Sequence, residues 1–205
     1  MQKNTTSKII NLALTGASGA QYGFRLLECL LNANHTVYLM VSKAAQVVIG
    51  METDIKLPGR ASEMQKFLIK RYKCNSKQLR VYGEDEWTSP AASGSSLIDA
   101  MVVCPCSMGA LSAIATGASN NLIERAADVM LKERKKLIIV PRESPLSDIH
   151  LENMLKLSRM DAVIVDANPG FYNRADTVED LVDFVVGKIL DQLGVENDLQ
   201  PRWGS

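Results

Sequence analysis

The apolar residues of this chain fall into short continuous runs, and between the runs they recur at helical spacing. The runs cover residues 9–14, 35–41, 99–104, 136–140 and 162–165. Continuous apolar runs of this length are typical of strands that are buried on both faces. Helical spacing is present in residues 22–31, 61–73, 146–160 and 178–193. Because strands and helices alternate, the pattern predicts an α/β fold. We expect a Rossmann-like three-layer sandwich with helices on both faces of a mostly parallel sheet.

Length and charge narrow the class of protein. A chain of 205 residues fits one domain, so we expect a single domain over residues 1–205 with a C-terminal tail from about residue 194. Lysine plus arginine equal aspartate plus glutamate at 23 each, which disfavours a nucleic-acid partner. No apolar run approaches the ~18 residues of a membrane span, and the N-terminus has no signal-like segment. We therefore expect a cytoplasmic protein without a membrane span.

Two turns of small residues follow predicted strands directly. Gly16, Ser18 and Gly19 follow the first strand and lead at once into a helix, and residues 107–110 repeat this arrangement. Free backbone N–H groups and the positive end of a helix dipole favour an anion, so a nucleotide phosphate is the expected ligand. The spacing matches neither the dinucleotide fingerprint nor the P-loop. A turn that serves only helix packing is the alternative.

Other polar residues follow strands at the same predicted edge of the sheet. Ser42 follows the second strand, where it either caps a helix or contacts a ligand. Arg142 and Glu143 follow the strand at 136–140. Arg142 is a candidate phosphate ligand, and Glu143 is a candidate proton-transfer group, with an ion pair or a helix N-terminal acid as its alternative role.

Basic residues and one long loop supply further candidates. The loop at 82–96 contains Ala92-Ser93-Gly94, where bare backbone can come close to a bound group. Arg125, Lys132 and Lys188 lie on predicted helices. Each is either an ordinary surface charge or a ligand to a second phosphate.

The cysteines do not indicate a metal site. With only two histidines in the chain and no second C-x-x-C partner, Cys104-Pro105-Cys106 lacks the ligands of a metal centre. We expect no metal, reduced thiols, and Cys104 and Cys106 buried at a strand end.

Four segments together carry a family resemblance. They are LTGASGA at the first turn, AASGS at 91–95, PCSMGALSAIATGASNNLIERAADVMLKERKKLIIVPRE at 105–143 and NPGFY at 168–172. Over nearly the whole chain, the sequence resembles the flavin prenyltransferases of the UbiX and Pad1 group. The resemblance implies a homo-oligomer, usually a dodecamer, that binds reduced FMN. It also implies transfer of a dimethylallyl group from dimethylallyl phosphate to N5 and C6 of FMN. A UbiD-type decarboxylase would use the prenylated FMN in ubiquinone biosynthesis.

The resemblance also implies roles for particular residues. FMN would be bound by Gly16, Ala17, Ser18, Ser42, Ser107, Met108, Gly109, Ala110 and Arg142. The allylic substrate would be bound by Arg125, Lys132, Tyr172, Lys188 and Trp203, and by Ala92, Ser93 and Gly94 of a neighbouring subunit. Ser18 and Glu143 would move protons at the flavin. Trp203 would offer a π face to developing positive charge, with ordinary packing as the alternative.

Two other functions remain as alternatives. Flavin-dependent cysteine decarboxylases share the PCSMGALSAIATGASNNL block, but their catalytic histidine and their PxMNxxMW-like motif have no counterpart at 141–149, PRESPLSDI. A non-catalytic FMN carrier would bind FMN but would not need Glu143, Tyr172 or Lys188.

Overall fold

The chain folds around one parallel sheet. The computed structural model describes residues 7–171 and 174–201. Its strands are β1 (Ile9–Leu14), β2 (Thr36–Val41), β3 (Leu79–Tyr82), β4 (Ala100–Cys106), β5 (Lys136–Pro141) and β6 (Val163–Ile164). They lie in the order β3-β2-β1-β4-β5-β6, and all five neighbouring pairs are parallel. The chain winds outward in both directions from β1 and β4, so the crevice between their carboxyl ends is where such a fold binds its ligand.

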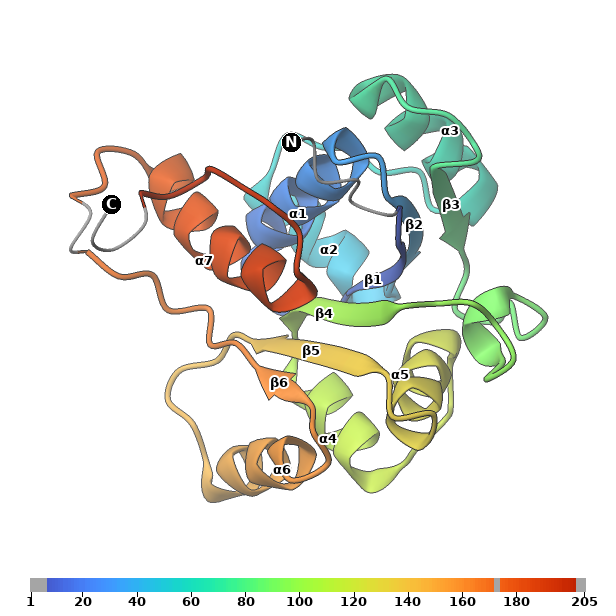
Figure 1. Cartoon of the computed structure of the whole chain (residues 1–205), viewed down its shortest axis with the longest axis vertical. Helices are drawn as coiled ribbons and strands as arrows, with labels where there is room; N and C mark the ends of the chain where they lie inside the picture. Colours follow the sequence, from blue (N-terminus) through green and yellow to red (C-terminus); the bar gives the residue numbers. More distant parts are fainter. Residues whose placement is uncertain (1–6, 172–173, 202–205) are drawn as a thin grey trace, which may run out of the picture.

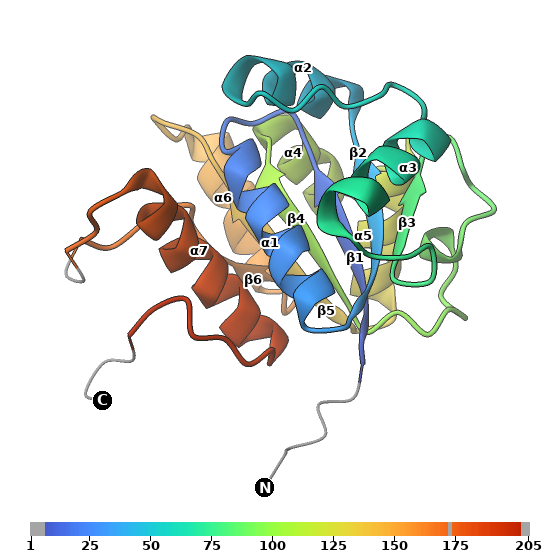
Figure 2. The same ribbon diagram turned by 90° about the horizontal axis from the view of Figure 1, so that it is seen from above.

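Helices cover both faces of this sheet (Figure 1). They are α1 (Ala20–Asn32), α2 (Lys43–Glu52), α3 (Ala61–Tyr72), α4 (Met108–Thr116), α5 (Leu122–Lys132), α6 (Asp148–Ser158) and α7 (Val178–Leu193), with a 3₁₀ turn, η1, at Pro90–Ala92. In the described part of the chain, none of them combines the length and the apolar character needed to cross a bilayer. Figure 2 shows α2 at the end of the sheet where α1 begins.

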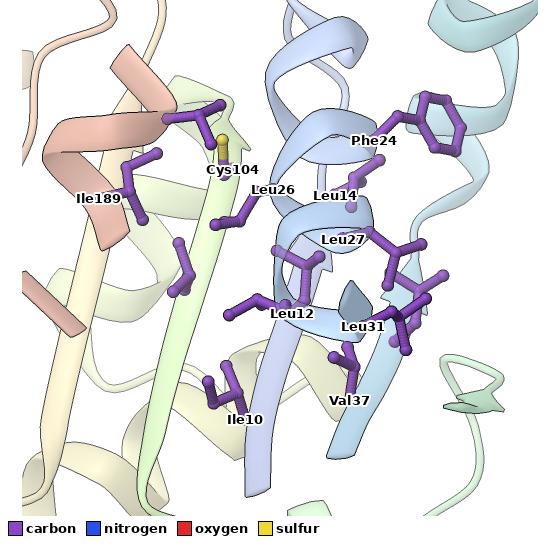
Figure 3. Packing of buried hydrophobic residues seen from close by; sticks show 14 of the residues in the cluster. Ile10, Leu12, Leu14, Phe24, Leu26, Leu27, Leu31, Val37, Cys104 and Ile189 are labelled. Carbon is purple, nitrogen blue, oxygen red and sulfur yellow. The ribbon is translucent and has the colours of Figure 1, made fainter. Parts of the chain in front are cut away.

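The first face of the sheet packs mainly against α1. Leu26, Leu27 and Leu30 of this helix are fully buried, and they meet β1, β2 and β4 side chains that include Leu12 and Cys104 (Figure 3). The inward side chains of α7 complete this layer. Burial of each large apolar side chain contributes about 1.5–3 kcal/mol, so this layer holds the start of α1 firmly at the carboxyl end of β1.

The second face of the sheet packs against α4, α5, η1 and Met154 and Leu157 of α6. Ala13 of β1 and Val103 of β4 lie on this face under Ala126 and Met130 of α5. The two helix layers and the sheet between them confirm the predicted three-layer α/β sandwich, and the sheet is wholly parallel.

Three local differences from the predicted elements have simple causes. Strand β3 was not predicted, because four residues at the sheet edge with two exposed or half-buried positions carry little apolar signal. The sequence predicts a helix that starts after residues 107–110, and the structure has two helices there, α4 and α5. Gly117 ends α4 because it adopts a left-handed φ of 76°. Helix α6 starts at Asp148, because the Ser147 hydroxyl accepts a hydrogen bond from the His150 N–H and caps the helix.

Candidate functional site

One pocket lies where the strands β1, β4 and β5 end. It has a volume of about 320 Å³. We call it the strand-end pocket, and it is lined by Gly16, Ala17, Ser18, Val48, Met51, Glu52, Ser107, Arg142 and Glu143. Six of these nine residues are sequence-predicted site residues. The structure therefore brings together the first turn, the start of α4 and the Arg142-Glu143 pair, as the parallel topology requires.

The first turn is shaped by its contact with α2. A Cβ atom at Gly16 would lie 2.5 Å from the Cβ of Ala44, so a glycine at this position lets the turn pack against the start of α2. Gly19 has φ of 105°, a left-handed conformation that glycine adopts without strain. These two glycines have structural roles, and the backbone of Ala17 and Ser18 remains beside the pocket.

The N-terminus of α1 is occupied by a carboxylate of the protein itself. Glu52, the last residue of α2, accepts hydrogen bonds from the N–H groups of Gly19 at 2.9 Å and Ala20 at 3.1 Å. Burial raises the pKa of Glu52. Hydrogen bonds from Ser18, Gly19 and Ala20 and the charge of Arg142 outweigh this effect, and the pKa lies below its usual range. The anion expected at this helix start is thus a side chain, and sequence reasoning missed Glu52.

The starts of α4 and α2 are capped by the serines that precede them. The Ser107 hydroxyl accepts a hydrogen bond from Ala110 N–H at 3.3 Å, and the Ser42 hydroxyl accepts one from Ala45 N–H at 3.0 Å. Ser107 lines the strand-end pocket. Ser42 does not, and neither do the other α4 residues predicted to bind FMN, which are Met108, Gly109 and Ala110. A Cβ at Gly109 would meet nothing within 4 Å, so a ligand can approach the first turn of α4 closely.

Arg142 and Glu143 extend from the end of β5 into the pocket. The Arg142 Nε donates a hydrogen bond to the Ser18 carbonyl at 3.3 Å, which places the guanidinium beside the first turn. The Glu143 carboxylate is exposed and accepts a hydrogen bond from the Ser144 N–H at 3.1 Å. The pocket thus contains one guanidinium, two carboxylates and two serines, of which Ser18 hydrogen-bonds to Glu52 and Ser107 caps α4.

A second group of predicted residues lies elsewhere, along α5. We call Ala92, Ser93, Gly94, Arg125 and Lys132 the loop–α5 cluster. Arg125 Nε donates to the Ala92 carbonyl at 3.1 Å, and a Cβ at Gly94 would lie 2.7 Å from the Lys132 ammonium. Among the described residues, none of this cluster lines the strand-end pocket of its own chain.

Three other predicted substrate residues are placed as follows. Lys188 is exposed on α7, where its ammonium lies 5.6 Å from the centre of the Phe184 ring, and it does not line the strand-end pocket. Tyr172 and Trp203 lie outside the described residues.

The buried thiols are poor candidates for nucleophiles. Cys104 and Cys106 are fully buried, as predicted. Burial raises the pKa of Cys106 to about 12 and that of Cys104 further, so both remain protonated near neutral pH.

A larger cleft of about 610 Å³ lies between α1, α3 and α7. It contains no sequence-predicted site residue. Of its two guanidinium groups, that of Arg25 pairs with Asp183 at 2.7 Å, and that of Arg71 lies 6.0 Å from the centre of the Tyr72 ring. We assign the functional site to the smaller strand-end pocket for two reasons. It lies at the crevice between β1 and β4, and it combines charged side chains with the backbone of the first turn.

The strand-end pocket fits a flavin phosphate compound such as FMN. The open first turn of α4 and the Arg142 guanidinium favour an anion, while Val48 and Met51 offer an apolar wall to an aromatic ring. Met51 is 81 % exposed in the single chain, so this wall is available to a ligand.

Comparison with known proteins identifies the family of the chain and FMN as its cofactor. Residues 1–190 match the family model described as Flavoprotein. The chain is 60% identical over 195 residues to the flavin prenyltransferase UbiX of Pseudomonas aeruginosa, with 95% of this chain and 93% of that protein covered. The crystal structure of AnUbiX (PadA1) in complex with FMN and dimethylallyl pyrophosphate is 39% identical and covers 98% of this chain and 99% of its own, with a TM-score of 0.86. A dodecameric FMN-dependent UbiX-like decarboxylase from Escherichia coli O157:H7 is 39% identical and covers 96% of this chain and 100% of its own, with a TM-score of 0.84.

Proposed function

The chain belongs to the UbiX family of flavin prenyltransferases, and from this premise we propose that it joins a dimethylallyl group from dimethylallyl phosphate to reduced FMN. The C–O bond to the phosphate would break and phosphate would leave, while new bonds would form to N5, which loses its proton, and to C6 of the flavin. The observation that carries this proposal is the strand-end pocket, where Ser107 at the start of α4, the Arg142 guanidinium and the carboxylates of Glu52 and Glu143 lie together. Reduced FMN supplies the nucleophile, which agrees with a pocket that has no thiolate.

The chain's own residues would hold FMN through charge and backbone N–H groups. Arg142 contributes positive charge beside the first turn, and the N–H groups at the start of α4 add the positive end of a helix dipole. Ala17 and Ser18 of the first turn line the same pocket. Ser42 anchors the start of α2 next to Gly16, so we propose that it supports this turn as well as capping its helix.

Proton movement would fall to Ser18 and Glu143, with Glu52 supporting Ser18. All three line one pocket, and the Ser18 side chain is a hydrogen-bond partner of Glu52. Glu52 is held ionised by the N–H groups of Gly19 and Ala20, so it can accept a hydrogen bond from the Ser18 hydroxyl and orient it. Within residues 7–171 and 174–201, Glu143 accepts a hydrogen bond from the Ser144 N–H alone and is the freer acid–base group.

We propose that the phosphate of the substrate is bound by the loop–α5 cluster of a neighbouring subunit. Arg125 and Lys132 carry positive charge beside the loop backbone at Gly94. In the single chain they pair with Asp128 and Glu133, so the phosphate would share them with these carboxylates. The cluster does not line the pocket of its own chain, so an oligomer is needed to bring it to the reacting group. The dodecameric relative supports such an assembly. Tyr172, Trp203 and Lys188 remain predicted contributors to the same substrate.

Further parts of the function stay proposals. We propose that residues 1–205 act as one flavoprotein domain with a short C-terminal tail, in the cytoplasm. The product, prenylated FMN, would be passed to a UbiD-type decarboxylase in ubiquinone biosynthesis. This partner would receive the flavin after release, because the flavin itself is the molecule that is modified.

Separate incubations distinguish this function from its two alternatives. In the first incubation, the purified protein is given reduced FMN and dimethylallyl phosphate without oxygen. In the second, it is given oxidised FMN and a peptide that ends in cysteine. The proposal expects prenylated flavin in the first incubation and unchanged peptide in the second. A decarboxylated peptide would indicate the cysteine decarboxylase function. Bound but unmodified FMN with unchanged peptide, also when the diphosphate donor is supplied, would indicate a carrier.

A further inference from the structure

Thr15 joins the end of β1 to the end of β4. Its side chain is buried, and its Oγ1 donates a hydrogen bond to the Pro105 carbonyl at 3.0 Å. The same Oγ1 accepts a hydrogen bond from the Ser107 N–H at 2.7 Å. The Thr15 N–H also donates to the Pro105 carbonyl, at 3.1 Å. One residue therefore makes three hydrogen bonds between the two strand ends.

These bonds lie where the regular pairing of the two strands stops. The ladder between β1 and β4 ends at the pair Ala13 and Val103, and β4 shifts its register against β5 between Val103 and Cys106. Beyond this point, Thr15 carries the connection between the strands. Because a buried hydroxyl with a donor and an acceptor has one orientation, the connection also fixes a distance.

Both segments that Thr15 connects line the strand-end pocket. Gly16 follows it directly and begins the first turn, while Ser107 is its hydrogen-bond partner and the cap of α4. The hydroxyl of Thr15 does not itself line the pocket. Its effect on a ligand must therefore pass through the relative position of these two segments.

We infer that Thr15 is a positioning residue, which sets the spacing between the first turn and the start of α4 and thereby the affinity for FMN. The inference rests on the proposed function, because it takes FMN to be the ligand that contacts both segments. It is independent of the prenyl transfer, since it concerns binding alone.

Two substitutions separate the hydroxyl from the shape of the side chain. Thr15→Val keeps the shape but removes the acceptor of the Ser107 N–H and the second donor to Pro105. Thr15→Ser keeps the hydroxyl and loses a methyl group. As a control for stability alone, Ile138→Val removes a methyl group from a fully buried position on β5 that does not line the pocket.

The main measurement is the Kd for FMN of each full-length variant. The melting temperature without FMN is measured as well, and the change in KM for FMN is compared with the change in kcat. We expect Thr15→Val to raise the Kd about tenfold, as loss of one buried hydrogen bond does. The KM for FMN should rise by more than kcat falls. Thr15→Ser should restore a Kd close to that of the wild type, and Ile138→Val should lower the melting temperature and leave the Kd unchanged.

Three results would overturn the inference. They are a wild-type Kd in Thr15→Val, a Kd in Thr15→Ser as weak as in Thr15→Val, and an equal loss of affinity in Ile138→Val. If Thr15→Val does not fold, Thr15→Ala replaces it, because this change removes the same hydroxyl. A wild-type protein that binds FMN but forms no prenylated flavin would count against the proposed function and would leave the comparison of Kd values intact.

Discussion

The Oε2 atom of Glu52 lies 2.9 Å from the backbone nitrogen of Gly19, so the last residue of α2 closes the first turn of α1. This contact joins residues 33 positions apart in the chain. It places a negative charge on the positive end of the α1 dipole and holds α2 over the strand-end pocket. Part of the pocket is therefore shaped by a contact between charged and dipolar groups of the chain itself.

Glu52→Gln should destabilise the protein without FMN at pH 7, by about 0.3–1 kcal/mol, because the amide keeps an acceptor but loses a charge that solvent partly screens. The pKa of Glu52 is lowered in the folded protein, so its carboxylate stabilises the fold above the usual value of 4.5. That stabilisation is lost as the pH falls through the lower, folded pKa. Denaturant unfolding of both proteins over this pH range measures the effect.

The difference in unfolding free energy between wild type and Glu52→Gln should shrink as the solution becomes more acidic. Glu152→Gln is the control, since Glu152 is exposed on α6 and lies outside the pocket. A difference that stays constant with pH would contradict the role given to the Glu52 charge.

Glu143→Gln should retain FMN and slow formation of prenylated flavin by about 10²–10⁴-fold, as loss of a general acid–base group does. The substitution keeps the size of the side chain and its acceptor for the Ser144 N–H. The rate of product formation and the Kd for FMN are measured together. A variant with the wild-type rate would remove Glu143 from the mechanism.

Gly16→Ala should weaken both folding and FMN binding, because the new Cβ would lie 2.5 Å from the Cβ of Ala44. Overpacking of this kind costs about 1–3 kcal/mol. The double variant Gly16→Ala with Ala44→Gly removes the clash and should recover most of the unfolding free energy. Equal instability in the single and double variants would show that the contact with α2 is not the reason for glycine at position 16.

Oligomers that mix Glu143→Gln with Arg125→Ala should be more active than either pure variant. If Arg125 serves a neighbouring subunit, some sites in the mixture combine an intact Glu143 with an intact Arg125. The two chains are co-expressed with different tags, and the mixed oligomer is purified through both. Activity no higher than that of the pure variants would mean that Arg125 serves its own chain.

The sequence predicts the parts of this structure that local patterns determine. Apolar runs and the two small-residue turns locate β1, β4 and the helix starts that follow them. Parallel topology then brings Ser18, Ser107 and Arg142 to one edge. The spacing of Thr177 and Asp180 is that of a capping box, and both hydrogen bonds of this box are present at the start of α7.

The parts that the sequence does not predict depend on contacts between distant segments. Glu52 ends an ordinary amphipathic helix, and no pattern near it shows that its carboxylate reaches Gly19. In the sequence, Thr15 is only the last residue of an apolar run. Its hydrogen bond from the Ser107 N–H depends on the fold, so the sequence does not predict it. The sequence also does not predict that Arg125 lies away from the strand-end pocket, because a polar position on a helix does not reveal which site its side chain serves.

The most direct test of the account is the mass of the flavin extracted after one anaerobic incubation of the wild-type protein with reduced FMN and dimethylallyl phosphate. The account predicts FMN that has gained one five-carbon prenyl unit, and no gain in a sample without protein. FMN of unchanged mass, in a protein shown to bind it and with the diphosphate donor also supplied, would contradict the account.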